Sequence, residues 1–234
     1  MIEETYIETY LFISPNEYKI FLFDTKNFKN LYNKELKFDD NKNSIDLKIL
    51  NNFLDNNIFK IEKLVGKFIK NIFLILEINE TNILNIGFKK KNYENTISEK
   101  FLSEILIEAK DIFRENYQNK KILHLLIDKY LINGKSYEKF ENNLKSDHLC
   151  VETKFISIPN DVLFEIDKVL EKYQIKIIRY LDSNYIKKFF KTENIGFSYM
   201  VFKILKGCNY NEVLIVPKNS KKLGFFEKFF QLFS

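Results

Sequence analysis

The sequence predicts a layered α/β (or α+β) fold. Its 234 residues are 45% hydrophobic, which is enough to bury a core. Short stretches rich in β-branched and aromatic residues alternate with longer stretches whose apolar residues lie three and four positions apart. Taken in order, these stretches read strand, strand, helix, strand, strand, helix, strand, strand, helix, strand. An alternation of this kind indicates helices layered on sheets.

The first 80 residues predict a hairpin, a helix and a buried strand. Residues 5–12 and 19–24 flank a turn-forming Ser-Pro-Asn-Glu sequence, which predicts an antiparallel hairpin. A polar connection follows, and Ser44 is the expected cap of a helix over residues 45–68. One stripe of this helix holds Leu47, Leu50, Leu54, Ile58, Ile61, Val65 and Phe68. Residues 72–76 are continuously apolar, as in a strand of a parallel or mixed sheet that is covered on both faces.

The next segment predicts a strand, a helix and a second strand. The strand covers residues 82–88, and the helix covers about 97–117, where apolar residues again recur at helical spacing. A strand over residues 121–131 ends at Asn133 and Gly134, a pair typical of a tight hairpin turn. Residues 135–147 are polar, and we expect a loop there.

The following 60 residues complete the predicted layers. Residues 151–158 predict a strand, 161–173 a helix and 174–181 another strand. Residues 196–205 predict one more core helix, and 212–216 a short strand. The helix over 161–173 is expected to turn Val162, Phe164, Ile166, Val169 and Leu170 toward the core.

Composition and the lack of known motifs argue against most kinds of binding site and catalytic site. The 37 basic residues against 32 acidic ones give a net charge of only +5, unlike a dedicated nucleic-acid binder. Two distant cysteines and six scattered glycines form neither a disulfide framework nor a phosphate-binding loop. His124, in an apolar strand, is interpreted as a satisfied core or edge histidine, and His148, in a polar loop, as solvated. We therefore expect no catalytic, cofactor-binding or metal-binding residue, and no enzymatic activity.

The C-terminal segment carries the strongest functional pattern. Residues 217–222 form a lysine-rich linker, and on a helical wheel the residues after it divide into an apolar half and a polar half. Such a helix is suited to the interface of an anionic membrane. The predicted membrane-binding residues are Lys221, Lys222, Leu223, Phe225, Phe226, Phe229, Phe230, Leu232 and Phe233. A terminal helix that docks on the protein's own core remains the alternative.

The N-terminus bears on location. Its first nine residues carry Glu3, Glu4 and Glu8 where a signal peptide needs positive charge, and no apolar run approaches the ~18 residues of a spanning helix. The expected location is therefore cytoplasmic, and peripheral on the cytoplasmic face of the inner membrane.

The segment ILHLLIDKYLING, residues 122–134, resembles the characteristic strand of the bacterial cell-division protein FtsA family. His124, Tyr130 and Gly134 fall in step with it, and the strand and helix after residue 150 follow in the family's order. The resemblance implies a partial actin-like (ribonuclease H-like) lobe with an inserted strand-helix-strand-strand subdomain. The implied division is residues 1–80 and 159–216 for the lobe, 81–158 for the insertion, and 217–234 for the linker and amphipathic helix.

The sequence differs from the FtsA family at the phosphate-binding motifs and in length, and these differences change the expected function. The first phosphate-binding turn is replaced by Ser14-Pro15-Asn16-Glu17-Tyr18, and the second phosphate motif and nearly the whole second lobe are missing. The resemblance therefore implies a nucleotide-free, membrane-tethered adaptor of cell division. Its expected partners are the lipid surface of the inner membrane and other division proteins, with self-association as a further possibility. Direct binding to the tubulin-like FtsZ is doubtful, because the family's docking site for it lies in the missing lobe.

Two alternatives stay open. A PilM-like cytoplasmic scaffold of a pilus or secretion system shares the same actin-like plan. A basic nucleic-acid binder would use Lys89, Lys90 and Lys91 with Tyr93, but lysine runs in so lysine-rich a chain are usually solvated faces. No nucleic acid is expected as a partner.

Overall fold

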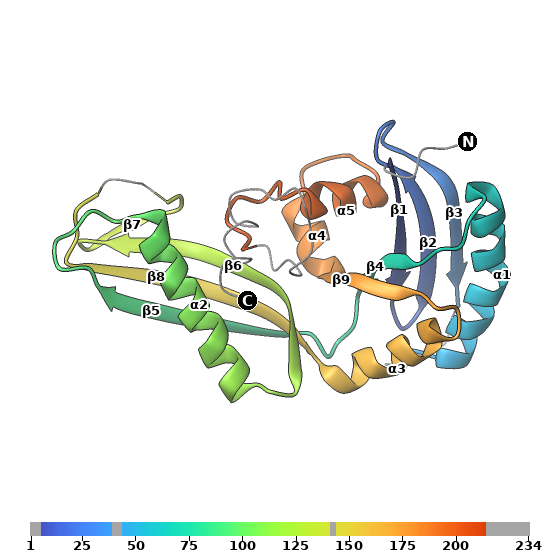
Figure 1. Ribbon diagram of the computed structural model, residues 1–234, viewed down its shortest axis with the longest axis horizontal. Coiled ribbons are helices and arrows are strands. Elements are labelled where there is room, and N and C mark those ends of the chain that lie inside the picture. The colour runs from blue at the N-terminus through green and yellow to red at the C-terminus, as the bar shows by residue number, and fades with distance from the viewer. Residues whose placement is uncertain (1–5, 39–43, 141–143, 214–234) are drawn as a thin grey trace. The chain divides into compact units, whose positions relative to one another are not determined.

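The computed structural model describes residues 6–38, 44–140 and 144–213. It divides into two compact units (Figure 1). Unit 1 comprises Met1–Thr81 and Pro159–Cys208, and unit 2 comprises Asn82–Ile158 and Asn209–Ser234. Each unit has its own sheet with at least one helix packed on it, so the predicted α/β class is confirmed. The predicted amphipathic helix at the C-terminus lies outside the described residues.

Unit 1 is built on a mixed five-stranded sheet of order β3-β2-β1-β4-β9. Its strands are β1 (Ile7–Ile13), β2 (Glu17–Asp24), β3 (Lys29–Lys37), β4 (Asn71–Leu76) and β9 (Lys176–Asp182). The first three form an antiparallel meander, whereas β4 runs parallel to both β1 and β9. The predicted hairpin and the predicted buried parallel strand are both confirmed.

Strand β3 was not predicted, because nearly all its side chains are polar or exposed. It forms the edge of the sheet, where among the described strands only β2 lies beside it. Backbone pairing joins it to β2, and an ion pair crosses the two strands: Nζ of Lys19 lies 3.0 Å from Oε2 of Glu35. Beside it, Nζ of Lys37 lies 2.7 Å from Oε1 of Glu35. The ammonium groups of Lys37 and then Lys19 lower the pKa of Glu35 to about 2.

Both faces of the unit 1 sheet are covered. The rings of Phe12, Phe21 and Phe23 pack against α5 (Phe197–Leu205). The neighbouring residues Leu11, Ile20 and Leu22 point to the opposite face and are buried as well. The other helices of this unit are α1 (Leu47–Val65), α3 (Asn160–Glu171) and the short α4 (Ser183–Phe189), which was not predicted. Helices α1 and α3 pack against each other.

Helix α1 is shorter than predicted at both ends. Its cap is Asp46, not Ser44: Oδ1 of Asp46 accepts hydrogen bonds from the backbone amides of Lys48 and Ile49 at 3.0 and 3.1 Å. At the other end Gly66 takes a left-handed conformation, φ 79°, which a side chain disfavours. The chain therefore leaves the helix before Phe68, which is 79% exposed instead of part of the buried stripe.

Unit 2 has a four-stranded sheet of order β5-β8-β6-β7. Its elements are β5 (Asn82–Lys91), α2 (Glu99–Asn116), β6 (Lys120–Ile132), β7 (Lys135–Tyr137) and β8 (His148–Pro159). The predicted turn is present, with Asn133 at φ 51° and Gly134 at φ 77°. It leads into β7, a three-residue strand where a loop was expected. Helix α2 covers the sheet, and the rings of Phe113 and Phe155 stack with centroids 4.8 Å apart in the core.

The predicted inward face of α3 is partly wrong. Leu163, Ile166, Val169 and Leu170 are buried, whereas Phe164 is 58% exposed. The helix begins at Asn160, and its inward stripe includes Leu163 rather than the predicted Val162 and Phe164. Phe164 is therefore an exposed aromatic side chain on the surface of α3.

Candidate functional site

The nine predicted membrane-binding residues, from Lys221 to Phe233, all lie outside the described residues. Their role stays a prediction from the sequence. The described part of the chain supplies three places where functional side chains gather: the β1–β2 turn, the surroundings of the two histidines, and a groove between α1 and α3.

The β1–β2 turn stands where the family resemblance places a phosphate-binding turn. The backbone amide and the hydroxyl of Ser14 both donate to the carbonyl oxygen of Glu17, at 2.9 and 3.1 Å. The carbonyl of Asn16 in turn accepts the amide of Phe38 at 3.1 Å. The donors of Ser14 thus close the turn on itself and do not line a cradle of amides. Loss of ATP binding stays a prediction.

His124 is buried, as the sequence analysis predicted, with 1% of its surface exposed. Its Nδ1 lies 2.7 Å from Oε1 of Glu212, and both side chains are fully buried. The two residues are 88 positions apart, so the sequence offered no signal for the pairing. The interpretation of His124 as a satisfied core histidine is confirmed.

The backbone around Glu212 extends this contact. Leu126 and Glu212 form an antiparallel bridge. The amide of Ile127 donates to the carbonyl of Asn211, and the amide of Val213 to the carbonyl of Leu125, both at 2.8 Å. The sequence analysis placed residues 209–213 with the lobe, but in the structure they pack in unit 2. The chain that leads into the basic C-terminal linker is thus attached to β6.

His148 begins β8 and is half-buried, where a solvated loop residue was expected. Its Nδ1 lies 2.7 Å from Oδ2 of Asp147. With Lys89 and Cys150, both residues line a cavity of about 380 Å³. Burial, and then the charge of Glu152, raise the pKa of the Cys150 thiol, which keeps it protonated and poorly nucleophilic.

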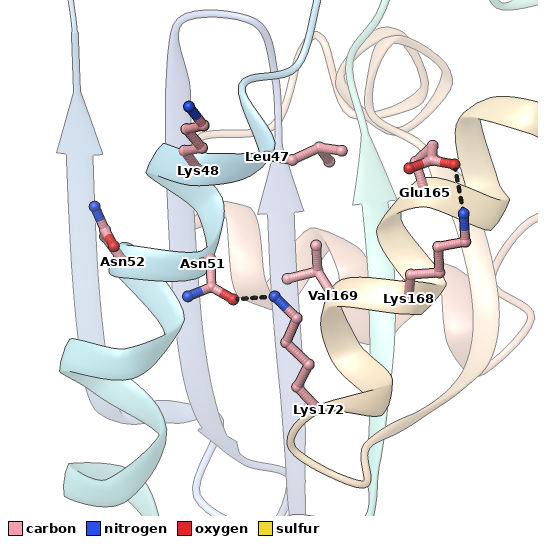
Figure 2. Close-up of a pocket in the computed structure, with 8 residues that line it drawn as sticks. All are labelled: Leu47, Lys48, Asn51, Asn52, Glu165, Lys168, Val169 and Lys172. Carbon is pink, nitrogen blue, oxygen red and sulfur yellow. Dashed lines mark hydrogen bonds and ion pairs between the residues drawn. The ribbon is translucent and has the colours of Figure 1, made fainter.

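A groove of about 560 Å³ lies between α1 and α3 (Figure 2). Leu47 and Val169 give it an apolar floor, and the remaining lining side chains are polar or charged: Lys48, Asn51, Asn52, Glu165, Lys168 and Lys172. The lining thus carries three ammonium groups and one carboxylate, of which Lys168 and Glu165 are paired (Figure 2). The lining residues from α1 lie more than 100 positions before the other four, so only the packing of α1 on α3 brings the two groups together.

Polar contacts across the groove hold its two walls. Nζ of Lys172 donates to Oδ1 of Asn51 at 3.0 Å (Figure 2). The hydroxyl of Tyr173 lies 2.7 Å from Oδ1 of Asp55 and 3.2 Å from the carbonyl oxygen of Asn51. Burial, and then the hydrogen bond and the charge of Asp55, raise the pKa of Tyr173, so that the phenol stays a donor. These contacts link α1 to the residues at the end of α3.

The α3 wall adds an exposed aromatic ring. Nζ of Lys168 donates to Oε1 of Glu165 at 3.0 Å and lies 4.1 Å from the ring centroid of Phe164. Phenylalanine is enriched at protein contacts whereas lysine is depleted there, so of this pair it is the exposed ring that favours a protein contact. Within residues 6–38, 44–140 and 144–213, no group of three His, Cys, Asp or Glu side chains could hold a metal ion.

The helix cap of α1 is expected to support this groove. Replacing Asp46 with alanine removes the acceptor for two backbone amides at the groove's end, and should lower the free energy of unfolding by about 1 kcal/mol. Urea denaturation followed by circular dichroism measures it. Asn52→Ala, at an exposed position of the same helix, is the control. An Asp46→Ala variant no less stable than this control would show that the cap contributes nothing.

Comparisons with known proteins return structures but no relatives in sequence. No protein-family model matches the chain, and no curated protein is similar to it. Among the described residues, no helix has the length and apolar character needed to cross a membrane.

Solved structures, among them the following three, resemble the chain. The first is the PilM-PilN type IV pilus biogenesis complex, at 10% identity and a TM-score of 0.47, covering 78% of this chain and 49% of that one. The second is the cytoplasmic domain of EpsL, an inner membrane component of the type II secretion system of Vibrio cholerae (9% identity, TM-score 0.36, 77% and 57% covered). The third is a Bacteroides thetaiotaomicron protein with an actin-like ATPase fold and unknown function (14%, 0.33, 84% and 61%).

The chain spans between about half and three fifths of the length of these structures. All three identities are 14% or lower, and all three TM-scores are below 0.5. None of the three identifies a family for this chain; the α/β class rests on the two sheets themselves.

Proposed function

We propose that this protein is a non-enzymatic adaptor that attaches to the cytoplasmic face of a membrane through its C-terminal segment and presents its two units for protein contact. The observation that carries the proposal is the sequence pattern of residues 217–234. Leucines and phenylalanines fill one half of the helical wheel there, and three lysines, Lys218, Lys221 and Lys222, precede or begin it. The exposed ring of Phe164 on α3 supports the second half of the proposal, because aromatic side chains are enriched at protein contacts.

The expected attachment is weak and reversible. Seven apolar side chains would each contribute about half of the 1.5–3 kcal/mol of full burial. Each lysine near an anionic surface adds about 1 kcal/mol. Ordering the helix costs about 1–2 kcal/mol per residue. For a single chain these gains at best offset the ordering cost, so strong attachment needs several chains in one assembly.

The finer function is an FtsA-like role in cell division, which the ILHLLIDKYLING segment supports. Its rival is a PilM-like scaffold of a pilus or secretion system; PilM and EpsL, which the structural comparison returns, belong to such systems. The location of a fluorescent fusion in the cell separates the two. Accumulation at the septum supports the division role, and accumulation elsewhere in the envelope supports the rival.

The test of membrane attachment is co-sedimentation with anionic vesicles. Phe226→Asp together with Phe230→Asp places two carboxylates on the apolar half of the wheel, and the bound fraction should fall to the level of a vesicle-free sample. The matched control is Gly224→Asp together with Gln231→Asp. It adds the same charge on the polar half.

The control pair should keep most of the binding, because only long-range repulsion from the lipids changes. Equal losses in the two pairs would mean that charge alone, and not an apolar face, drives attachment. If the unchanged protein did not sediment with vesicles at all, the adaptor would have no membrane anchor in this segment, and the proposal would fail.

A further inference from the structure

The outer edge of β5 is the longest uncovered strand edge in unit 2. The strand's ten residues, Asn82 to Lys91, pair one by one with β8. On its other side β5 is the terminal strand of the order β5-β8-β6-β7, so among the described strands none pairs with it there. Backbone amides and carbonyls along such an edge are a template for another strand.

The charges on β5 are confined to its end. Residues 82–88 carry no charged side chain, and the three lysines all follow at positions 89–91. Lys90 is engaged by α2, with Nζ 3.6 Å from carboxylate oxygens of both Glu104 and Glu108. Folded proteins commonly protect long edge strands with lysines, bulges or short length. The first seven residues of β5 have none of these protections.

We propose that the outer edge of β5 is a self-association site, at which two copies of this chain pair antiparallel through residues 82–88. In an antiparallel pair centred on Asn85, the uncharged segment of one copy lies opposite the same segment of the other. Lys89, Lys90 and Lys91 then fall beyond the partner copy's Asn82, so that no two lysines are opposite each other. A parallel pair would place like lysines side by side, which is destabilising.

The side chains in this register are complementary. Ile83, 63% exposed, falls opposite Gly87, around which nothing lies within 4 Å of the position a Cβ would occupy. Leu84 falls opposite Ile86, and both already pack against the core of unit 2 from the partly buried face. Asn85 falls opposite its own copy, as the two-fold symmetry of an isologous contact requires.

This inference goes beyond the proposed function and does not depend on it. Pairing of two edges extends the unit 2 sheet from four strands to eight, and two chains in one particle carry two C-terminal segments. The contact area of a single strand edge is small, so the dimer should form and dissociate with concentration instead of being permanent.

The test uses the full-length chain in lipid-free buffer, with mass measured by sedimentation velocity across a concentration series. The unchanged protein should approach the mass of two 28.2 kDa chains as its concentration rises. Asn85→Lys and Asn85→Asp should each weaken the dimer by about threefold to tenfold, because each places like charges opposite each other. An equimolar mixture of the two variants should restore it, because the opposed charges then attract.

Asn33→Lys, the same substitution at an exposed position of strand β3 in unit 1, is the matched control and should leave the dimer unchanged. The Asn85 side chain is exposed, so neither substitution disturbs a core. A monomer up to about 1 mM, equal weakening by Asn33→Lys, or a mixture that stays monomeric would each overturn the inference. Membrane attachment is measured separately with vesicles, so the two proposals fail independently.

Discussion

Replacing Glu212 with leucine should lower the free energy of unfolding by about 3–5 kcal/mol, the range found when one member of a buried pair is removed. Both side chains of the His124–Glu212 pair are fully buried, with 2.7 Å between Nδ1 and Oε1. Leucine cannot accept a hydrogen bond, so the imidazole loses this partner without gaining water. Urea denaturation measures the loss.

The loss should be accompanied by local opening. The amides of Ile127 and Val213, which bond across the same bridge, should exchange hydrogen faster in the variant. The double variant His124→Leu with Glu212→Leu should regain part of the lost stability, because no buried polar group is left from the pair. Glu152→Leu, at a half-exposed carboxylate paired with Lys129, is the control and should cost about 0–1 kcal/mol. If Glu212→Leu cost no more than this control, the pair would not be a stabilising contact.

The bridge also has a functional consequence. Residues 211–213 are the last described residues before the lysine-rich linker, and the pair attaches them to unit 2. In the Glu212→Leu variant the membrane-binding segment itself is unchanged, so vesicle binding should persist while stability falls. Vesicle binding therefore reports on the membrane-binding segment, whereas the free energy of unfolding reports on the attachment of residues 211–213 to unit 2.

Phe155→Ala should destabilise unit 2 by about 3–5 kcal/mol. The Phe155 ring is fully buried and stacks on Phe113 at 4.8 Å with an interplanar angle of 13°. Removing the ring leaves a cavity between α2 and the sheet. It also removes the stacked aromatic pair with Phe113. Hydrogen exchange read unit by unit is the measurement, because a chain of two compact units need not unfold in one step.

Faster exchange should be confined to unit 2, since Phe155 belongs to the core of that unit alone. Phe164→Ala removes an equal ring from a position that is 58% exposed, and should change stability by less than about 1 kcal/mol. Comparable losses in the two variants would contradict the assignment of Phe155 to the core.

Where apolar residues repeat, local sequence was enough to predict the elements. Strands β1, β2, β4 and β6 and helix α2 were found because burial imposes a period of two or a continuous apolar run on strands, and a period near 3.6 on helices. The Asn133-Gly134 turn was found because few other residue pairs accept two positive φ values.

The missed elements are those that bury little apolar surface of their own. The polar strand β3 joins the sheet only because β2 is already in place, and β7 has three residues. Phe164 and Phe68 were assigned to the core because they fall among the apolar residues of predicted helices, but the register of α3 and the early end of α1 expose them. Apolar residues are common on protein surfaces, so identity alone could not decide their burial.

The sequence by itself determined the α/β class, most of the core-facing residues of the helices and the amphipathic pattern of the C-terminal segment, because each depends on the spacing of residues close together in the chain. Only the tertiary structure decided the partner of His124, the walls of the α1–α3 groove and the position of β5 at a sheet edge. Each of these depends on which elements pack together, and such contacts join residues tens of positions apart, where local periodicity carries no information.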